Sequence, residues 1–580
     1  MPAPRPIPGY DSLSVEHDVP ARMRDGTVLY ADVYRPSKPG RYPVILYRHP
    51  YNKAPVASLT YAHAVWYARH GYMVVNQDVR GRWKSEGEWY PFLHEADDGE
   101  DTVEWAAALP GSNGRVGMMG FSYYGATQLQ AALRRPPSLR CICPGMTTGQ
   151  YYDGWTYNQG ALALAFTASW ATFLAIGEAQ RRGDDAAAGA LLGAFFGGPN
   201  LYGYLPLRDY PPLAQSGLAP YFQDWLDHPT YDDYWRRWSV DTDYSRVDVP
   251  ALHVGGWYDV FLSGTVGNFN GLRQGAGSER SRAQQKLLVG PWYHIPWTPM
   301  PGSVYLGPQA SNQAVNDWQL RWFDQFLKDE ERGVLDAAVT LFVLGENAWR
   351  DEREWPPRGT RFVDYYLHSD GRANSATGDG TLSPESPGHE PPDIYSYDPV
   401  FPVPSVGGHS CCFPNVAPMG MEPQGLPEAF NGVLVYTSEP LERDLTVIGP
   451  VSATLYAATD AADTDFTVKL CDVHPNGVSY NIQKGIVRAS YRDSLTDPTP
   501  IVPNEIYEYT VNLGPTANVF KAGHRIRVDV SSSDFPQWDR NLNTGGPLGT
   551  QGLARARVAN QVVLHSDRYA SRISLPIAEG

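Results

Sequence analysis

Cysteine is scarce in this chain, and its scarcity argues against a fold held together by disulfides. Only five of the 580 residues are cysteine: Cys141, Cys143, Cys411, Cys412 and Cys471. The odd number and the close pairs do not resemble a disulfide framework, and no CxxC spacing indicates a metal site. Because unpaired cysteine is among the residues most often buried, we interpret all five as buried free thiols.

An excess of positive charge is also lacking, since 63 acidic residues outnumber 47 basic ones and give a net charge of −16. An acidic surface is repelled by phosphate backbones and anionic lipids, so we expect neither a nucleic-acid nor a membrane partner. The first eight residues contain no apolar run typical of a secretory signal, which makes a cytoplasmic location the expectation.

One uncharged stretch, residues 154–177, is long enough to cross a bilayer. Polar side chains such as Asn158 and Gln159 interrupt it, and alanine supplies much of its apolar content. We therefore predict a buried helix in a globular domain.

Strand and helix patterns alternate over residues 1–145, and such alternation predicts a mostly parallel sheet with helices on both faces. Strand patterns return near Leu252 and Leu287, so residues 247–354 are predicted to complete the same α/β domain. An amphipathic helix at 315–326 is expected to pack on this sheet.

Two further regions differ in pattern, as expected because 580 residues exceed a single core. Residues 146–246 are rich in alanine and aromatics without convincing strands, which indicates a helical insertion. Residues 355–580 show period-2 alternation, for example Val451, Ala453 and Leu455 against polar neighbours, which indicates an antiparallel sandwich or jelly roll.

Ser122 lies between a short apolar strand and a helix beginning near Ala126. A serine on such a turn has an exposed hydroxyl beside helix N–H groups that can stabilise an oxyanion. The position predicts a nucleophile for acyl transfer.

Candidate partners of Ser122 follow two later strands, in the chain order nucleophile, acid, base. Asp259 follows the strand at Leu252, and His294 follows the strand at Leu287. We assign His294 as the base and Asp259 as the residue that orients it. His253 lies within a strand and is expected to be a core histidine, while His49 precedes the nucleophile and is a weaker candidate.

The serine turn departs from the G-x-S-x-G pattern, because Tyr124 stands where the second glycine belongs and Gly125 follows. With its neighbours, however, the turn resembles the bacterial cocaine esterase family (CocE/NonD hydrolases), whose S-Y-x-G pattern accommodates the tyrosine. The motifs that carry this resemblance are GFSYYGATQ (120–128), RHPYNK (48–53), DVRGRWKSEG (78–87), GWYD (256–259), GPWYH (290–294), LGENAWR (344–350), PVPSVGG (402–408) and AGHRIR (522–527).

The resemblance implies an α/β-hydrolase core, a helical cap and a C-terminal jelly roll. It also implies an oxyanion hole made by a tyrosine hydroxyl and the backbone N–H after the nucleophile, here Tyr51 and Tyr123. It permits a homodimer. No metal or organic cofactor is expected, since no phosphate loop and no cluster with ligand spacing is seen.

The substrate is predicted to lie where the three regions meet, because pockets favour domain junctions. The candidate lining residues are Trp155, Phe166, Trp170, Phe173, Trp257 and Phe261, to which the loop with Cys411, Cys412 and Phe413 adds. Their aromatic content favours a carboxylesterase acting on small-molecule esters with a hydrophobic or aromatic acyl group.

Two alternatives remain open. Relatives within the resemblance cleave X-Pro peptides, α-amino-acid esters or β-lactams, although the residues after Trp155 lack the carboxylates that an ammonium group needs. The jelly roll could instead make the chain a carbohydrate- or partner-binding protein.

Overall fold

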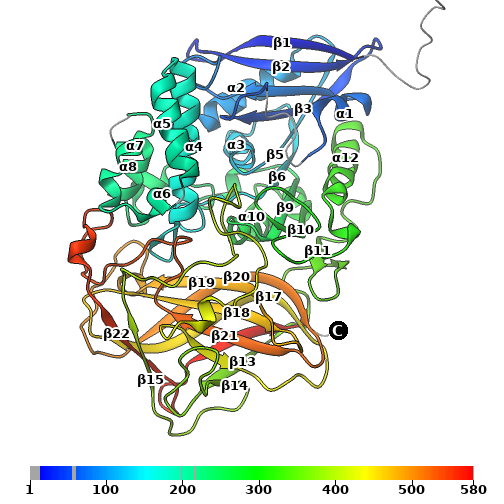
Figure 1. The fold of residues 1–580 in the computed structure, drawn as a ribbon. Helices are drawn as coiled ribbons and strands as arrows, with labels where there is room; N and C mark the ends of the chain where they lie inside the picture. Colours follow the sequence, from blue (N-terminus) through cyan, green and yellow to red (C-terminus); the bar gives the residue numbers. More distant parts are fainter. Residues whose placement is uncertain (1–12, 55–60, 198, 215–216, 579–580) are drawn as a thin grey trace, which may run out of the picture.

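A ten-stranded mixed sheet forms the core of the N-terminal half in the computed structural model, which describes residues 13–54, 61–197, 199–214 and 217–578 (Figure 1). Its strands are β1 (Leu13–Arg22), β2 (Val28–Pro36), β3 (Tyr42–His49), β4 (Met73–Asp78), β5 (Ser112–Phe121), β6 (Leu139–Gly145), β9 (Ala251–Tyr258), β10 (Gln285–Tyr293), β11 (Val339–Val343) and β12 (Ala348–Glu352). They lie in the order β1-β2-β4-β3-β5-β6-β9-β10-β11-β12, and the strands from β4 to β11 are parallel.

Helices cover both faces of this sheet, so its central strands are buried on both sides. The helices are α1 (Ala64–Arg69), α2 (Glu95–Ala107), α3 (Tyr123–Ala132), α10 (Leu262–Gly275), α11 (Glu279–Ala283) and α12 (Gln313–Lys328), with the short turn η3 (Pro308–Ala310). Every residue of β9 and β10 is buried, which explains their continuous apolar runs. Helix α12 packs on β5 as predicted, and a Cβ on Gly117 would come within 2.9 Å of Phe323.

A block of helices is inserted between β6 and β9, on the left in Figure 1. It comprises β7 (Tyr157–Asn158), β8 (Ala161–Leu162), α4 (Leu164–Arg182), α5 (Asp185–Phe196), α6 (Pro199–Gly203), η1 (Leu207–Asp209), α7 (Pro211–Ala214), α8 (Pro220–Asp227), α9 (Asp233–Arg236) and η2 (Tyr244–Arg246). Helix α4 contains much of the uncharged stretch and is buried along most of its length, as predicted. Within the described ranges, no helix is both long and apolar enough to cross a membrane.

The C-terminal half is an eleven-stranded, mainly antiparallel β domain. Its elements are β13 (Arg361–His368), β14 (Thr381–Ser383), β15 (Asp393–Tyr397), η4 (Pro427–Ala429), β16 (Leu434–Thr437), β17 (Leu445–Thr459), β18 (Asp465–Val473), β19 (Ser479–Arg488), η5 (Ala489–Tyr491), β20 (Tyr507–Phe520), β21 (Arg525–Ser531), η6 (Leu553–Arg555), β22 (Ala559–Leu564) and β23 (Arg572–Ile577). In β17 the apolar side chains Val451, Ala453 and Leu455 are buried and their polar neighbours are half-buried, so the predicted alternation is confirmed.

Backbone hydrogen bonds join the β domain directly to the α/β core. The N–H of Leu344 donates to the carbonyl of Ala517 at 2.9 Å, and the N–H of Val519 donates to the carbonyl of Leu344 at 2.8 Å. One buried apolar cluster also contains core residues such as Leu287 and β-domain residues such as Val468. This docking brings a β-domain loop, residues 408–413, against the carboxyl edge of the core sheet.

Candidate active site

Ser122 occupies a strained turn between β5 and α3. Its φ of 63° and ψ of −131° lie outside the regions that a non-glycine residue ordinarily adopts. Its N–H lies 2.9 Å from the carbonyl of Gly145 and 3.1 Å from that of Met146, which ties the turn to the end of β6. The strained conformation is therefore held by the neighbouring strand, and the side chain lies at the carboxyl edge of the sheet.

The departure from the G-x-S-x-G pattern has a steric explanation. A Cβ on Gly125 would lie 2.7 Å from Cγ2 of Thr147, so glycine is required where α3 approaches the chain after β6. The Tyr124 ring stacks on His49 with centroids 4.3 Å apart and on Phe121 at 6.0 Å. Gly120 has a φ of +134°, and a Cβ there would come within 2.3 Å of the Tyr124 Cβ. The turn therefore admits a tyrosine because Gly120 leaves space for it.

His294 and Asp259 form a buried hydrogen-bonded pair at the ends of the adjacent parallel strands β10 and β9. Nδ1 of His294 lies 2.6 Å from Oδ1 of Asp259, and both side chains are almost fully buried. Burial raises the pKa of Asp259, while the charge and the hydrogen bond of His294 oppose that rise. With Nδ1–H donating to the carboxylate, Nε2 is left as the basic atom.

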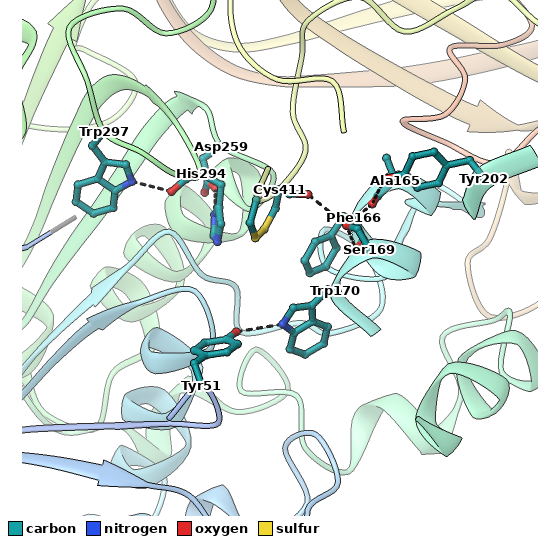
Figure 2. The surroundings of a disulfide bond; sticks show 11 residues. Tyr51, Ala165, Phe166, Ser169, Trp170, Tyr202, Asp259, His294, Trp297 and Cys411 are labelled. Carbon is teal, nitrogen blue, oxygen red and sulfur yellow. Dashed lines mark hydrogen bonds and ion pairs between the residues drawn. A yellow bond between two sulfur atoms is a disulfide. The ribbon is translucent and has the colours of Figure 1, made fainter. Parts of the chain in front are cut away.

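Nε2 of His294 is buried and has no hydrogen-bond partner among the described residues. The indole N–H of Trp297 donates to the carbonyl of His294 at 2.8 Å and fixes the backbone there (Figure 2). His294 and Ser122 line the same cavity. The structure thus brings the predicted nucleophile, base and acid to one edge of the sheet.

Tyr51 also lines this cavity, two residues after the end of β3. The indole N–H of Trp170 donates to its hydroxyl oxygen at 3.1 Å, which leaves the hydroxyl proton for another acceptor (Figure 2). Burial raises the pKa of Tyr51 to about 12, although hydrogen bonding to Trp170 and Ser122 opposes the rise. The phenol is therefore a neutral donor at ordinary pH.

Tyr123 is the first residue of α3, where backbone N–H groups have no carbonyl of their own helix to bind. Its side chain turns away from the cavity, because its hydroxyl donates to Glu95 at 2.9 Å and accepts the N–H of Phe92 at 2.9 Å. The backbone N–H is thus the group that Tyr123 offers to an oxyanion.

The cavity has a volume of about 420 Å³ and an almost entirely apolar wall. Its lining residues are Tyr47, Tyr51, Tyr61, Ala62, Met119, Gly120, Phe121, Ser122, Tyr124, Ser169, Trp170, Phe173, Phe195, His294, Ile295, Pro296, Cys412, Phe413 and Pro414. They come from the core, the helical insertion and the β domain. Among the predicted pocket residues, Trp170, Phe173, Cys412 and Phe413 line the cavity.

Four other predicted pocket residues lie behind the cavity wall. Trp155 stacks on Phe261 with centroids 4.2 Å apart, and the Phe166 ring packs edge-on against Phe261 at 5.1 Å. Phe261 in turn contacts the His294 ring at 5.2 Å. These side chains support the base, while Cys411 lies beside His294 without lining the cavity.

Trp257 does not line the cavity, in contrast to the prediction. Its indole N–H donates to the carbonyl of Phe342 at 2.6 Å, and its ring lies 6.1 Å from that of Trp355. Side chains alternate in direction along β9, and Trp257 points toward the β domain, where it joins the apolar cluster between the two halves.

The two other histidines considered from the sequence, His253 and His49, are buried and hydrogen-bonded to residues outside the proposed triad. His253 is buried beside Gln285, with Nε2 3.0 Å from Oε1, as expected of a core histidine. His49 is also buried, and burial lowers its pKa to about 3. Nε2 of the neutral ring lies 2.7 Å from Oδ1 of Asn76, and Nδ1 accepts the backbone N–H of Tyr51.

The interpretation of all cysteines as free thiols is wrong for one pair. Cys411 and Cys412 form a disulfide, while Cys141, Cys143 and Cys471 are buried free thiols. Two adjacent cysteines do not form the spaced pattern by which a disulfide framework is found in a sequence. Phe195 of α5 also lines the cavity, but the sequence did not indicate this role, because the pattern of its helix is that of any apolar helix.

Comparisons with known proteins cover both halves of the chain. Residues 25–296 match the family model described as X-Pro dipeptidyl-peptidase (S15 family), and residues 333–574 match that of the X-Pro dipeptidyl-peptidase C-terminal non-catalytic domain. The chain is 37% identical to the cocaine esterase of Rhodococcus sp. (strain MB1 Bresler), over 98% of this chain and 99% of that protein.

Solved structures are similar along the full length. An aminopeptidase from a marine sediment Thaumarchaeota archaeon has a TM-score of 0.82 at 25% identity, covering 100% of this chain and 98% of that one. An α-amino acid ester hydrolase has a TM-score of 0.82 at 24% identity with the same coverage, a likeness of fold. The predicted fold class, an α/β-hydrolase core followed by a β domain, is confirmed.

Proposed function

Since the chain belongs to the bacterial cocaine esterase family (CocE/NonD hydrolases), we propose that it is a serine carboxylesterase in which Ser122, His294 and Asp259 act together. The observation that carries the proposal is the buried imidazole of His294. Its Nδ1 is paired with Asp259, and its Nε2 is unpartnered among the described residues, in the cavity that Ser122 lines. A base so arranged can take the proton of a hydroxyl.

The proposed reaction runs through an acyl-enzyme. His294 Nε2 takes the proton of Ser122 as Oγ attacks the ester carbonyl, and Asp259 stabilises the imidazolium that forms. The oxyanion accepts hydrogen bonds from the Tyr51 hydroxyl and the Tyr123 N–H. When the intermediate collapses, His294 returns its proton to the departing alcohol, and a water molecule releases the acid by the same steps in reverse.

We propose that the acyl group is uncharged and hydrophobic or aromatic. No carboxylate is among the described residues that line the cavity, so nothing there pairs with the ammonium of an amino-acid or dipeptidyl substrate. Asp153, the acid near Trp155, accepts the N–H of Gln159 at 3.0 Å and lines a different cavity. This disfavours the X-Pro peptidase and amino-acid ester alternatives.

The test compares p-nitrophenyl acetate, butyrate and benzoate with an X-Pro-p-nitroanilide and a β-lactam. We expect turnover of the three esters to exceed that of the amide substrates, and Ser122→Ala to abolish it. Ser239→Ala is the matched control, because Ser239 is buried elsewhere and donates to Trp235. A wild-type chain that cleaves only the anilide or the β-lactam contradicts the proposal, as does a Ser122→Ala chain that keeps its activity.

Three sequence predictions remain part of this proposal. The domain boundaries near residues 145, 246 and 354 are tested by limited proteolysis, the permitted homodimer by sedimentation, and the cytoplasmic location by cell fractionation.

A further inference from the structure

A loop of the β domain brings two sulfur atoms close to His294, the general base of the proposed triad. His409 Nε2 lies 2.9 Å from the carbonyl oxygen of Trp257, and Ser410 forms a β-bridge with Asp259. Cys411 follows and lies beside the His294 ring (Figure 2), and the sulfur of Cys412 is also close to that ring. The loop is thus anchored to the strand that carries the catalytic acid.

The histidine and the two cysteines lie close enough together to share a metal ion once the sulfurs are reduced. One ring nitrogen of His294 and the two Sγ atoms all lie within 4.8 Å of one another. Ligands about 2.0–2.3 Å from a tetrahedral zinc ion are separated by less than this limit. The two sulfurs, which are bonded in the oxidised chain, must move apart before both can bind one ion. In the oxidised chain the two sulfurs are bonded to each other and are not thiolates.

We propose that, when the Cys411–Cys412 disulfide is reduced, these two thiolates and Nε2 of His294 bind a thiophilic divalent metal ion such as Zn²⁺. The ion takes the nitrogen that must accept the Ser122 proton, so the reduced, metal-loaded enzyme is inactive. The disulfide form does not bind the ion and stays active. The inhibition rests on the proposed esterase function, whereas metal binding does not.

The chemical balance of both steps is simple. Two thiols of a cellular reductant give their hydrogens to Cys411 and Cys412 and become a disulfide themselves. The metal ion then displaces one proton from each cysteine, and the neutral imidazole binds through its lone pair.

Two further features favour a metal ion at this place. Two thiolates cancel the charge of a divalent ion, so the complex is neutral, as the apolar wall around Cys412 requires. Nδ1 of His294 already donates to Asp259 at 2.6 Å, and a carboxylate is one of the acceptors that orient metal-bound histidines.

The described part of the chain holds two other groups that could bind a metal ion: Asp472, His474 and His524, and Glu428, Cys471 and Asp529. The first contains no thiol and lies partly exposed, and the second contains one thiol. Neither depends on the Cys411–Cys412 disulfide, so the redox state of the protein separates them from the proposed site.

The test uses the full chain in two redox states. The disulfide is reduced with tris(2-carboxyethyl)phosphine, which becomes the phosphine oxide with oxygen from water, and the reagent is removed without air. Thiol counting in denaturant should find the three free cysteines before reduction and all five after it. Each form is then titrated with Co²⁺, and the thiolate-to-cobalt charge-transfer absorption is recorded.

We expect one Co²⁺ per reduced chain with strong thiolate absorption, displaced by Zn²⁺, and no such absorption from the oxidised chain. The Zn²⁺ concentration that displaces Co²⁺ should stop ester hydrolysis by the reduced chain and not by the oxidised chain. EDTA should then restore hydrolysis by the reduced chain. Cys411→Ser/Cys412→Ser should weaken Co²⁺ binding at least about tenfold, because both thiolate ligands are lost. Cys471→Ser and His474→Ala are controls for the two other groups and should keep the absorption.

Equal Co²⁺ binding by both redox forms overturns the proposal, as does thiolate absorption that survives Cys411→Ser/Cys412→Ser but disappears in Cys471→Ser. The redox comparison needs no substitution, so it holds even where a variant fails to fold. If reduced wild type binds Co²⁺ as expected but hydrolyses no ester in either form, the metal site stands and the esterase proposal fails.

Discussion

His49 Nδ1 accepts the backbone N–H of Tyr51 at 3.1 Å, while the same ring stacks on Tyr124 at 4.3 Å. The phenol proposed to stabilise the oxyanion is therefore held by a histidine that lies behind the cavity wall. Because burial lowers the pKa of His49 to about 3, the ring stays neutral and keeps its acceptor nitrogen in the normal pH range.

Replacing Tyr51 by phenylalanine should lower kcat for p-nitrophenyl butyrate by about 100- to 1,000-fold, as loss of one oxyanion donor does in other hydrolases. KM should change little, because the ring that lines the cavity remains. Tyr67→Phe is the control: Tyr67 is a buried tyrosine whose hydroxyl donates to Gln319, outside the cavity. Equal effects of the two substitutions would refute the role of Tyr51.

His49→Ala should lower kcat by about 10- to 100-fold through misplacement of Tyr51, with KM nearly unchanged. A positioning role has a further consequence in the double variant. In a Tyr51→Phe background, His49→Ala should lower kcat only slightly further, because the hydroxyl donor that His49 positions is already gone. Full additivity of the two losses in kcat contradicts this role.

The pH–rate profile should show no alkaline loss attributable to the oxyanion donor between pH 8 and about 10. Tyr51 donates only in its protonated form, which persists below its pKa of about 12. Steady-state kcat in wild type, compared with Tyr51→Phe over the same range, should therefore give a constant ratio. A ratio that falls toward one below pH 10 contradicts the expected protonation state.

Phe195→Ala should broaden substrate range, because Phe195 lines both the 420 Å³ cavity and a neighbouring one of about 270 Å³. Its ring contacts Phe413 at 5.1 Å and Phe173 at 6.3 Å. If the two cavities join, the longer chain of an octanoyl ester can be buried, and each added methylene contributes about 0.8 kcal/mol. The ratio of kcat/KM for octanoyl to butanoyl esters should therefore rise at least about tenfold.

The neighbouring Phe196 is the control, since its side chain is 64% exposed. Phe196→Ala should leave the octanoyl-to-butanoyl ratio of kcat/KM within about twofold of wild type, because little apolar contact is lost. An unchanged ratio in Phe195→Ala would show that the wall does not limit chain length.

Asp393→Asn should destabilise the β domain by up to about 3–5 kcal/mol, since it removes the more deeply buried of the two charge partners of His565 and leaves only Glu390. Nε2 of His565 lies 2.9 Å from Oδ2 of Asp393, and Nδ1 lies 3.1 Å from Oε2 of Glu390. Burial alone lowers the pKa of His565, but Asp393 and Glu390 outweigh it and raise the pKa. Burial raises the pKa of Asp393, but its hydrogen bonds outweigh burial and lower the pKa. The bond from His565 has the largest effect among them.

The sign of the pH dependence follows from these two shifts. The raised pKa of His565 contributes stability that is complete below about pH 6.5 and is lost as pH rises through its folded pKa. The lowered pKa of Asp393 contributes stability above about pH 4 that is lost as the solution becomes more acidic. The Tm difference between wild type and Asp393→Asn, measured by calorimetry, should therefore be largest near pH 5. The exposed Asp370→Asn is the control, and a difference independent of pH contradicts the pairing.

Local patterns sufficed for the positions of Ser122, Asp259 and His294, because each follows a recognisable strand and parallel strands end at one edge. Tyr51 had no such signal, and only the family resemblance pointed to it. Trp257 was misplaced because an apolar strand buried on both faces does not reveal which residues face a cavity. Phe195 and the Cys411–Cys412 bond depend on how distant segments meet, which periodicity does not encode.

The β-bridge between Asp259 and Ser410 has a consequence for biosynthesis. The proposed nucleophile, acid and base are all translated before the segment that completes the cavity wall at Cys412, Phe413 and Pro414. A nascent polypeptide halted after the α/β core therefore contains all three residues of the proposed triad but lacks this part of the cavity wall. We therefore expect selectivity among esters to be complete only after the β domain has been translated and docked.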